Sequence, residues 1–212
     1  MNKMFSLDSP LMRGLSRMGD LMLLNFYFLL TSIPIVTIGA ACTALYSVTF
    51  RLGTDREEGV TASYFRAFGQ NFRQGTGMWL LILPAGLISL VDLMYFFSRT
   101  GALRYLAFLF GFLFALVVVV AAYAFPLLSQ FDNTVKMTLK NALILGVGYF
   151  PRTLVMGVLN LLPFALALMD IITFFQMGFF WFMFYFAAVA LINTKLLRKV
   201  FAPFLPEEEE TE

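Results

Sequence analysis

The sequence predicts an all-α membrane protein, a polytopic helical bundle with about six membrane segments and two cytoplasmic amphipathic helices. Two observations predict this fold class. The chain of 212 residues is 60% hydrophobic and only 13% charged, whereas a soluble domain averages about 25% charged residues. Its uncharged runs also have the length of about 20 residues that a bilayer core requires. These runs are 21–50, 74–91, 105–131, 153–169 and 171–194.

The polar segments between these runs are too short to bury a core of their own, so we expect one membrane domain over residues 1–212. Asp170 is expected at a tight outer turn between the last two spans. The expected parts are a cytoplasmic segment 1–19, a helical hairpin 20–51, an amphipathic segment 52–76, two spans 77–128, a second amphipathic segment 129–150, two spans 151–194 and a cytoplasmic tail 195–212.

The first apolar run contains the stretch Ser32-Ile33-Pro34 followed by Ile35-Val36-Thr37-Ile38-Gly39. Proline disfavours a helical conformation for the residue before it. The β-branched residues that follow suit extended backbone, and glycine is a natural corner residue. We therefore expect Pro34–Gly39 to be a corner between two short segments, with the helix restarting near Ala40.

The distribution of basic residues supports this hairpin. Lys and Arg concentrate in the cytoplasmic loops of bacterial membrane proteins. A hairpin leaves only Arg99 and Arg104 outside among the fifteen Lys and Arg of the chain. A single kinked span would place the basic residues of segment 1–19 outside as well. The hairpin, whether it crosses fully or re-enters, is the preferred interpretation, and it places both termini in the cytoplasm.

The first amphipathic segment carries an aromatic stripe. Phe65, Phe68 and Phe72 recur at helical spacing, while Arg66 and Arg73 face elsewhere. Such a helix lies at a membrane surface or docks on a partner protein. Both alternatives remain open from the sequence.

Catalytic and metal-binding residues are scarce in this chain. It has no histidine, its acidic residues share no motif, and its single cysteine, Cys42, excludes an internal disulfide. No nucleophile with its base, phosphate loop or metal-ligand set can be assembled from these residues. We therefore expect no enzyme activity, no catalytic residue, no cofactor and no metal.

Polar side chains within the apolar runs are the remaining candidates. Asn25 and Asn160 lie inside uncharged runs, where an amide facing lipid is unfavourable. A hydrogen bond between helices is the structural explanation, and contact with a transported solute is the functional one. Hydroxyl side chains of the hairpin, such as Thr37 and Thr43, mostly bond to their own backbone.

The N-terminal stretch FSLDSPLMRGLSRMGDLMLLNFYFLLTSIPIVTIGAACTALYSV resembles the signature of the YesL-like membrane proteins, a family of Gram-positive bacteria long labelled a domain of unknown function. The later blocks YFRAFGQNFRQGT and LKNALILGVGYFPRTL are similar to that family as well. The resemblance marks an interaction or packing motif of Arg13, Asp20, Asn25, Ser32, Pro34, Thr37, Gly39, Thr43 and Tyr46.

The resemblance implies a gene neighbourhood, because the genes of this family commonly lie beside those of carbohydrate ABC importers. It suggests a non-enzymatic accessory subunit or assembly factor in the plasma membrane that binds the permease subunits of a sugar importer. We expect membrane lipid and such permeases as partners, and no nucleic acid. Whether the chain binds sugar directly stays open, and the alternative is an independent transporter of small solutes.

Overall fold

The computed structural model describes residues 10–52 and 59–204, and within these ranges every regular element is helical. The all-α prediction is therefore confirmed. The helices are α1 (Pro10–Ser32), α2 (Ile38–Arg51), α3 (Val60–Phe97), α4 (Leu106–Gln130), α5 (Val135–Gly148), α6 (Phe150–Met169), α7 (Ile171–Gln176), α8 (Gly178–Phe180) and α9 (Phe186–Phe201). Short 3-10 helices cover Ile35–Thr37, Gly101–Tyr105 and Ala202–Phe204, and a π-helix covers Trp181–Tyr185.

Four helical stretches of the described residues are long and apolar enough to cross a membrane. They are Val60–Phe97, Gly101–Gln130, Phe150–Met169 and Gly178–Phe204, while Ile35–Arg51 is a shorter apolar helix. The coarse prediction of a polytopic helical membrane protein is confirmed. The count of six segments and the cytoplasmic position of the termini stay predictions.

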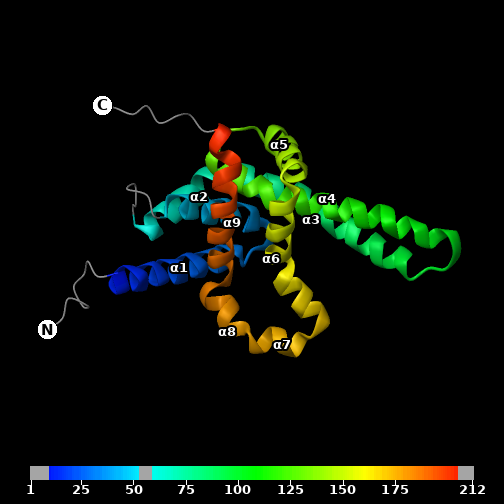
Figure 1. Ribbon diagram of the computed structural model, residues 1–212, viewed down its shortest axis with the longest axis horizontal. Coiled ribbons are helices and arrows are strands. Elements are labelled where there is room, and N and C mark those ends of the chain that lie inside the picture. Colours follow the sequence, from blue (N-terminus) through cyan, green and yellow to red (C-terminus); the bar gives the residue numbers. More distant parts are fainter. Residues whose placement is uncertain (1–9, 53–58, 205–212) are drawn as a thin grey trace.

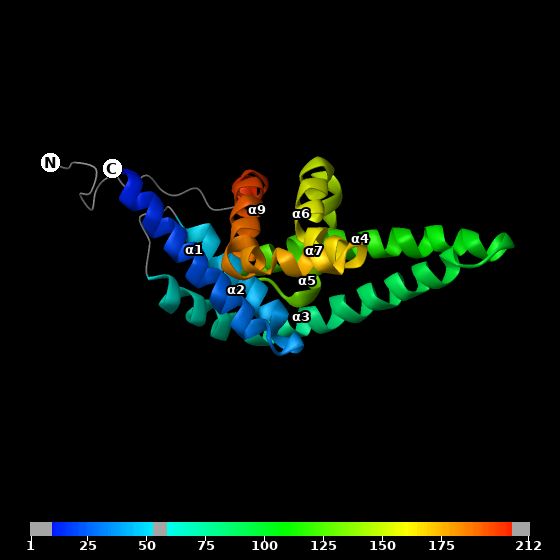
Figure 2. The same ribbon diagram turned by 90° about the horizontal axis from the view of Figure 1, so that it is seen from below.

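The four long helices form two pairs that cross each other. Helices α3 and α4 form a long hairpin whose loop projects far from the rest of the chain, and α6 and α9 run steeply across its base (Figure 1). The view turned by 90° shows the same projecting arm (Figure 2). In the most apolar 18-residue stretch of each hairpin helix, only 11% of residues are buried.

Helix α2 occupies the centre of the molecule and contacts α1, α3, α4 and α9. Ten of its 14 residues are buried. Its sequence, IGAACTALYSVTFR, is rich in small side chains, which let neighbouring helices approach closely. Gly39 has this role, because a Cβ atom there would lie 2.2 Å from the carbonyl oxygen of Gly75 in α3.

The predicted corner is present, but its details differ from the expectation. Within Pro34–Gly39 only Pro34 is extended, with φ −75° and ψ 109°. The chain then enters a 3-10 helix at Ile35 and α2 at Ile38, so Gly39 lies in a helix and not at the corner. Thr37 accounts for this early return, because its N–H and its Oγ1 both donate to the Pro34 carbonyl, at 2.9 and 2.7 Å.

The first amphipathic segment is also organised differently. It was expected as a separate helix ending near residue 76, yet α3 continues without a break for 38 residues. At 1.5 Å per residue α3 is about 57 Å long, whereas a bilayer core is about 30 Å thick. Part of this helix therefore extends beyond the apolar layer. The second amphipathic segment does form a separate helix, α5.

The chain turns at Asp170, as expected. Asp170 is extended and caps α7, because its carboxylate accepts hydrogen bonds from the Thr173 hydroxyl and the Ile172 N–H. These bonds lower the pKa of the Asp170 carboxyl below its ordinary value. The last apolar stretch starts at Gly178, later than the sequence suggested, because α7 forms a separate short helix before it.

Candidate functional site

Asn25 joins the first helix to the last membrane stretch. Its Nδ2 donates to the carbonyl oxygens of Trp181 and Phe182, at 3.1 and 2.6 Å, and its Oδ1 accepts from the Ala187 N–H at 3.0 Å. The side chain is fully buried. All three partners are backbone groups at or next to the π-helix Trp181–Tyr185.

This arrangement explains why a π-helix is tolerated there. A π-helical turn widens the helix and displaces backbone groups from their α-helical partners. A displaced polar group in an apolar layer is costly unless another partner is supplied. Asn25 supplies a donor and an acceptor at once. We call Asn25 with its three backbone partners the Asn25 clamp.

A second set of buried polar groups joins α2, α6 and α9. The Nδ2 of Asn193 donates to the hydroxyl of Tyr46 at 3.0 Å and to the Oδ1 of Asn160 at 3.3 Å. The hydroxyls of Thr49 and Thr194 lie 2.9 Å apart one turn away. Four of these five residues are buried, and Asn160 is half-buried. We call these five residues the polar cluster.

Asn193 leaves one hydrogen-bonding atom unsatisfied. Its side chain is fully buried, and its Oδ1 has no partner among the described residues. Turning the amide over would exchange the two atoms and leave the nitrogen unpaired instead. Buried polar atoms are nearly always hydrogen-bonded. The Asn193 Oδ1 is therefore an acceptor that is free to bind the donor of one small polar group.

The chemistry of the polar cluster is neutral. Its side chains are amides and hydroxyls, which can hold helices together or bind a small hydrogen-bonding molecule. Among residues 10–52 and 59–204, no group of three or more His, Cys, Asp or Glu side chains could hold a metal ion. The cluster therefore offers recognition by hydrogen bonds and no charged group.

Other residues of the N-terminal motif fix the corner. Besides its bonds to Pro34, the hydroxyl of Thr37 donates to the Thr31 carbonyl at 2.5 Å. The Ile35 carbonyl accepts from the Trp79 indole of α3 at 2.8 Å. The Ser32 hydroxyl is buried without a partner in the described chain. The corner is thus attached to α3.

The remaining motif residues have diverse positions. Thr43 donates to the Gly39 carbonyl of its own helix at 2.9 Å, as expected for a membrane hydroxyl. Asp20 is half-buried on α1. Arg13 belongs to α1, and its side chain lies outside the described part. The motif therefore combines the clamp, the corner and the polar cluster, which are separate contacts.

The aromatic stripe packs partly inside the molecule. Phe65 lies with its ring centroid 5.1 Å from that of Tyr27 in α1, and Phe68 lies 5.5 Å from Phe72. Phe65 and Phe72 are each 43% exposed, and Arg66 and Arg73 are exposed on the same helix. The stripe binds α1 on one side and remains accessible on the other.

Sequence reasoning missed Asn193 and the π-helix. Asn193 stands in the uncharged run 171–194, and the argument used for Asn25 and Asn160 applies to it equally. The π-helix leaves no local signal, because Asn25, its main partner, is 156 residues away in the chain.

The arrangement defines a class of protein: a multi-pass helical membrane protein in which neutral polar contacts join α1 and α2 to the last apolar stretch, Gly178–Phe204. Comparison with known proteins agrees with the family resemblance. Residues 21–93 match the family described as protein of unknown function, DUF624, and this match supports the resemblance to the YesL-like proteins. The matched segment runs from α1 into α3 and contains the corner and its contacts with α3.

A curated relative covers more of the chain. The chain is 29% identical over 194 residues to the uncharacterized protein YteU of Bacillus subtilis (strain 168), a match that covers 88% of this chain and 80% of the relative. No solved structure matches this chain.

Proposed function

We propose that this protein is a non-enzymatic accessory subunit of a carbohydrate ABC importer, which binds the permease subunits of the importer within the plasma membrane. The observation that carries the proposal is the projecting α3–α4 hairpin. Its sides are apolar and exposed along most of its length, as in Ile88, Val91 and Leu109. A subunit that joins a membrane complex needs such a lateral surface.

The partner is suggested by the sequence resemblance, which implies that the gene lies beside those of a sugar importer. Helix packing in membranes depends on close van der Waals contact, and the hairpin offers two helices to a partner. In this proposal the basic ends of α2 and α9, with Arg51 and Lys199, lie in the cytoplasm, and the hairpin loop with Arg99 and Arg104 lies outside.

The test is purification of the tagged full-length chain from its native membrane in mild detergent, after crosslinking, with partners identified by mass spectrometry. We expect the two permeases and the ATPase of one importer in stoichiometric amounts. Val91→Trp places a bulky group on the hairpin and should reduce their recovery at least tenfold. Val158→Trp on α6 is the matched control, because Val91 and Val158 are 61% and 57% exposed.

Recovery of the chain alone, after crosslinking as well, would reject the accessory role. Equal recovery with both tryptophan variants would keep the subunit and reject the hairpin as its docking surface. Each variant is first compared with the wild type by size-exclusion chromatography, so that a folding defect is not read as lost binding.

An independent transporter of small solutes is the second candidate, and the unpaired Asn193 Oδ1 favours it. The polar cluster would then contact the solute. In a reconstituted vesicle assay with labelled sugars, Asn160→Ala and Asn193→Leu should abolish flux while the protein stays folded. Under the accessory role, Asn160→Ala leaves recovery of the permeases unchanged, because the cluster then only packs helices.

A further inference from the structure

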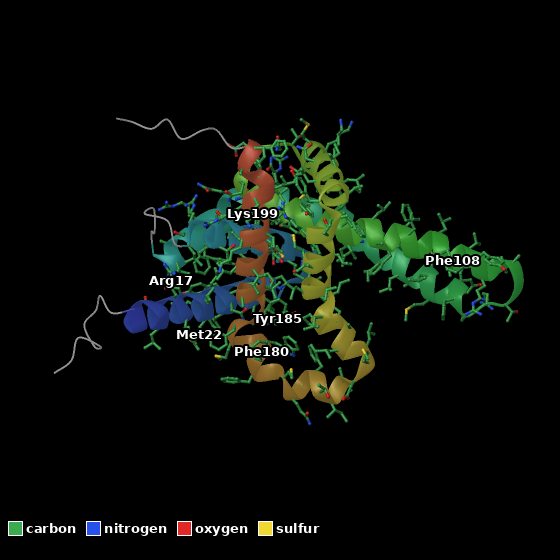
Figure 3. All side chains as sticks on the ribbon, in the orientation of Figure 1. Arg17, Met22, Phe108, Phe180, Tyr185 and Lys199 are labelled. Carbon is green, nitrogen blue, oxygen red and sulfur yellow. The ribbon has the colours of Figure 1, made fainter. Side chains whose placement is uncertain are left out.

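The free end of the α3–α4 hairpin contains a groove that the proposed function does not use. Its volume is about 1020 Å³, and it lies between the last turns of α3 and the first turns of α4. Phe108, labelled in Figure 3, marks this end of the arm. The lining includes Leu93, Phe97, Arg104, Tyr105, Phe108 and Gly111.

Small residues keep this groove open. Gly101 starts the connecting turn with φ +69°, a conformation that other residues rarely adopt. Ala107 and Gly111 follow on the lining side of α4. A Cβ atom at Gly111 would already contact Leu93 at 3.5 Å, so a larger side chain at this position would fill the space between the helices.

Two arginines stand at the same end of the hairpin. The Arg99 guanidinium lies 4.2 Å from the ring centre of Tyr95, and the Arg104 guanidinium lies 5.1 Å from that of Phe97. No Asp or Glu occurs between residues 93 and 131. Asp92, next to Leu93 of the lining, is the acidic residue nearest to them in the sequence, and each guanidinium lies over an aromatic ring.

We propose that this groove binds an anionic phospholipid, with an acyl chain between α3 and α4 and the phosphate at Arg104 and Arg99. The end of an apolar hairpin about 20 residues long lies at the depth of the lipid headgroups. Tyrosines and arginines prefer this depth, where Tyr95 and Tyr105 are placed as well. Guanidinium groups bind phosphate oxygens through paired hydrogen bonds.

The occupant is a lipid because the groove has two chemically distinct parts. Its apolar walls suit a hydrocarbon chain, and its cationic rim needs an anion. A phosphodiester on a hydrocarbon chain supplies both at this depth of a bilayer. A helix of a partner protein would cover the apolar walls but would need carboxylate side chains at this depth to pair with the two guanidinium groups.

The test uses purified full-length protein in detergent and native mass spectrometry with equal amounts of dioleoyl-phosphatidylglycerol and dioleoyl-phosphatidylcholine. The wild type should retain the anionic lipid preferentially. An exposed basic residue contributes about fivefold in binding to an anionic lipid surface, so the Arg99→Gln, Arg104→Gln double variant should lose most of this preference. Lys199→Gln on α9 is the charge control and should behave like the wild type.

The Gly111→Leu variant tests the groove itself. It should lower retention of both lipids, whereas Gly157→Leu on α6, where nothing lies within 4 Å of an added Cβ, should leave retention unchanged. Unchanged preference in the double arginine variant would overturn the proposal. So would a Gly111→Leu variant that keeps its lipid but loses the importer permeases, since the groove would then bind protein. Thermal melting verifies that all variants are folded.

Discussion

Helix α2 and the α3–α4 hairpin are both apolar, yet they have opposite surroundings. Ten of 14 residues in α2 are buried by other helices, whereas the most apolar windows of the hairpin are only 11% buried. The difference lies in side-chain size. Helix α2 is rich in Gly, Ala, Ser and Thr, and the hairpin is rich in Leu, Val and Phe. In a membrane, small residues mark the contacts between helices, and large apolar residues face lipid or a partner.

The largest effect is expected where two backbones meet. Gly39→Ala should destabilise the fold by about 3 kcal/mol or more, because its Cβ would overlap the Gly75 carbonyl and neither backbone can yield easily. Gly77→Ala in α3, with nothing within 4 Å, is the control and should be neutral. Thermal melting in detergent measures both. Equal melting temperatures would contradict the close contact of α2 and α3.

The Asn25 clamp should give the next largest effect. Asn25→Leu leaves three buried backbone groups without their side-chain partner. A fully unsatisfied group costs about 1–3 kcal/mol, and because the π-helix can relax and re-pair some of these groups, we expect a total loss of about 2–3 kcal/mol. Deleting Met183 from the π-helix in the same variant should restore much of the stability, because one residue fewer allows a regular α-helix. The deletion alone should be destabilising. Lack of any rescue would contradict the link between Asn25 and the π-helix.

A smaller effect is expected at the exposed end of α2. Arg198 of α9 donates to the Phe50 and Leu52 carbonyls, at 2.7 and 3.3 Å, and so satisfies acceptors at the C-terminus of α2. Arg198→Ala should cost about 0.5–1 kcal/mol. Lys199→Ala, one residue on, is the matched control. Urea titration of the purified protein resolves the difference, and equal midpoints would show that the contact adds nothing.

The hairpin surface should respond least. Ile88 is 62% exposed, so Ile88→Ala should change stability in detergent by less than about 0.5 kcal/mol. Met156 is fully buried, and Met156→Ala should cost about 2–5 kcal/mol. If both substitutions had the same effect, the comparison between a packed centre and an exposed arm would fail. Thermal melting of the two variants decides it.

The sequence predicted the local features of this fold better than its long-range contacts. Pro34 predicted the corner, because proline restricts the backbone conformation of the residues next to it in the sequence. The unbroken helix α3 was not foreseen, since the uncharged run 74–91 predicted a span separate from the amphipathic segment before it. In the structure Gly75 instead permits the contact with Ala40, whose Cα would lie 2.9 Å from a Cβ at this position.

The candidate site follows the same rule. The burial cost of an amide made Asn25 and Asn160 candidates, and both do make hydrogen bonds between helices. Their partners could not be predicted, because Asn193 and the π-helix meet them only through the packing of α1, α6 and α9. Spacing in the sequence carries no information on such contacts.

The length of α3 has a mechanical consequence. The helix is held near Gly75 by its contact with α2, with about 22 Å of helix on the Tyr64 side and about 33 Å on the side of the loop. If α3 turned as a rigid rod about this contact, the hairpin end would move about 1.5 times as far as the opposite end. Such a turn at the Phe65–Phe72 stripe would therefore produce a larger displacement at the far end of the hairpin.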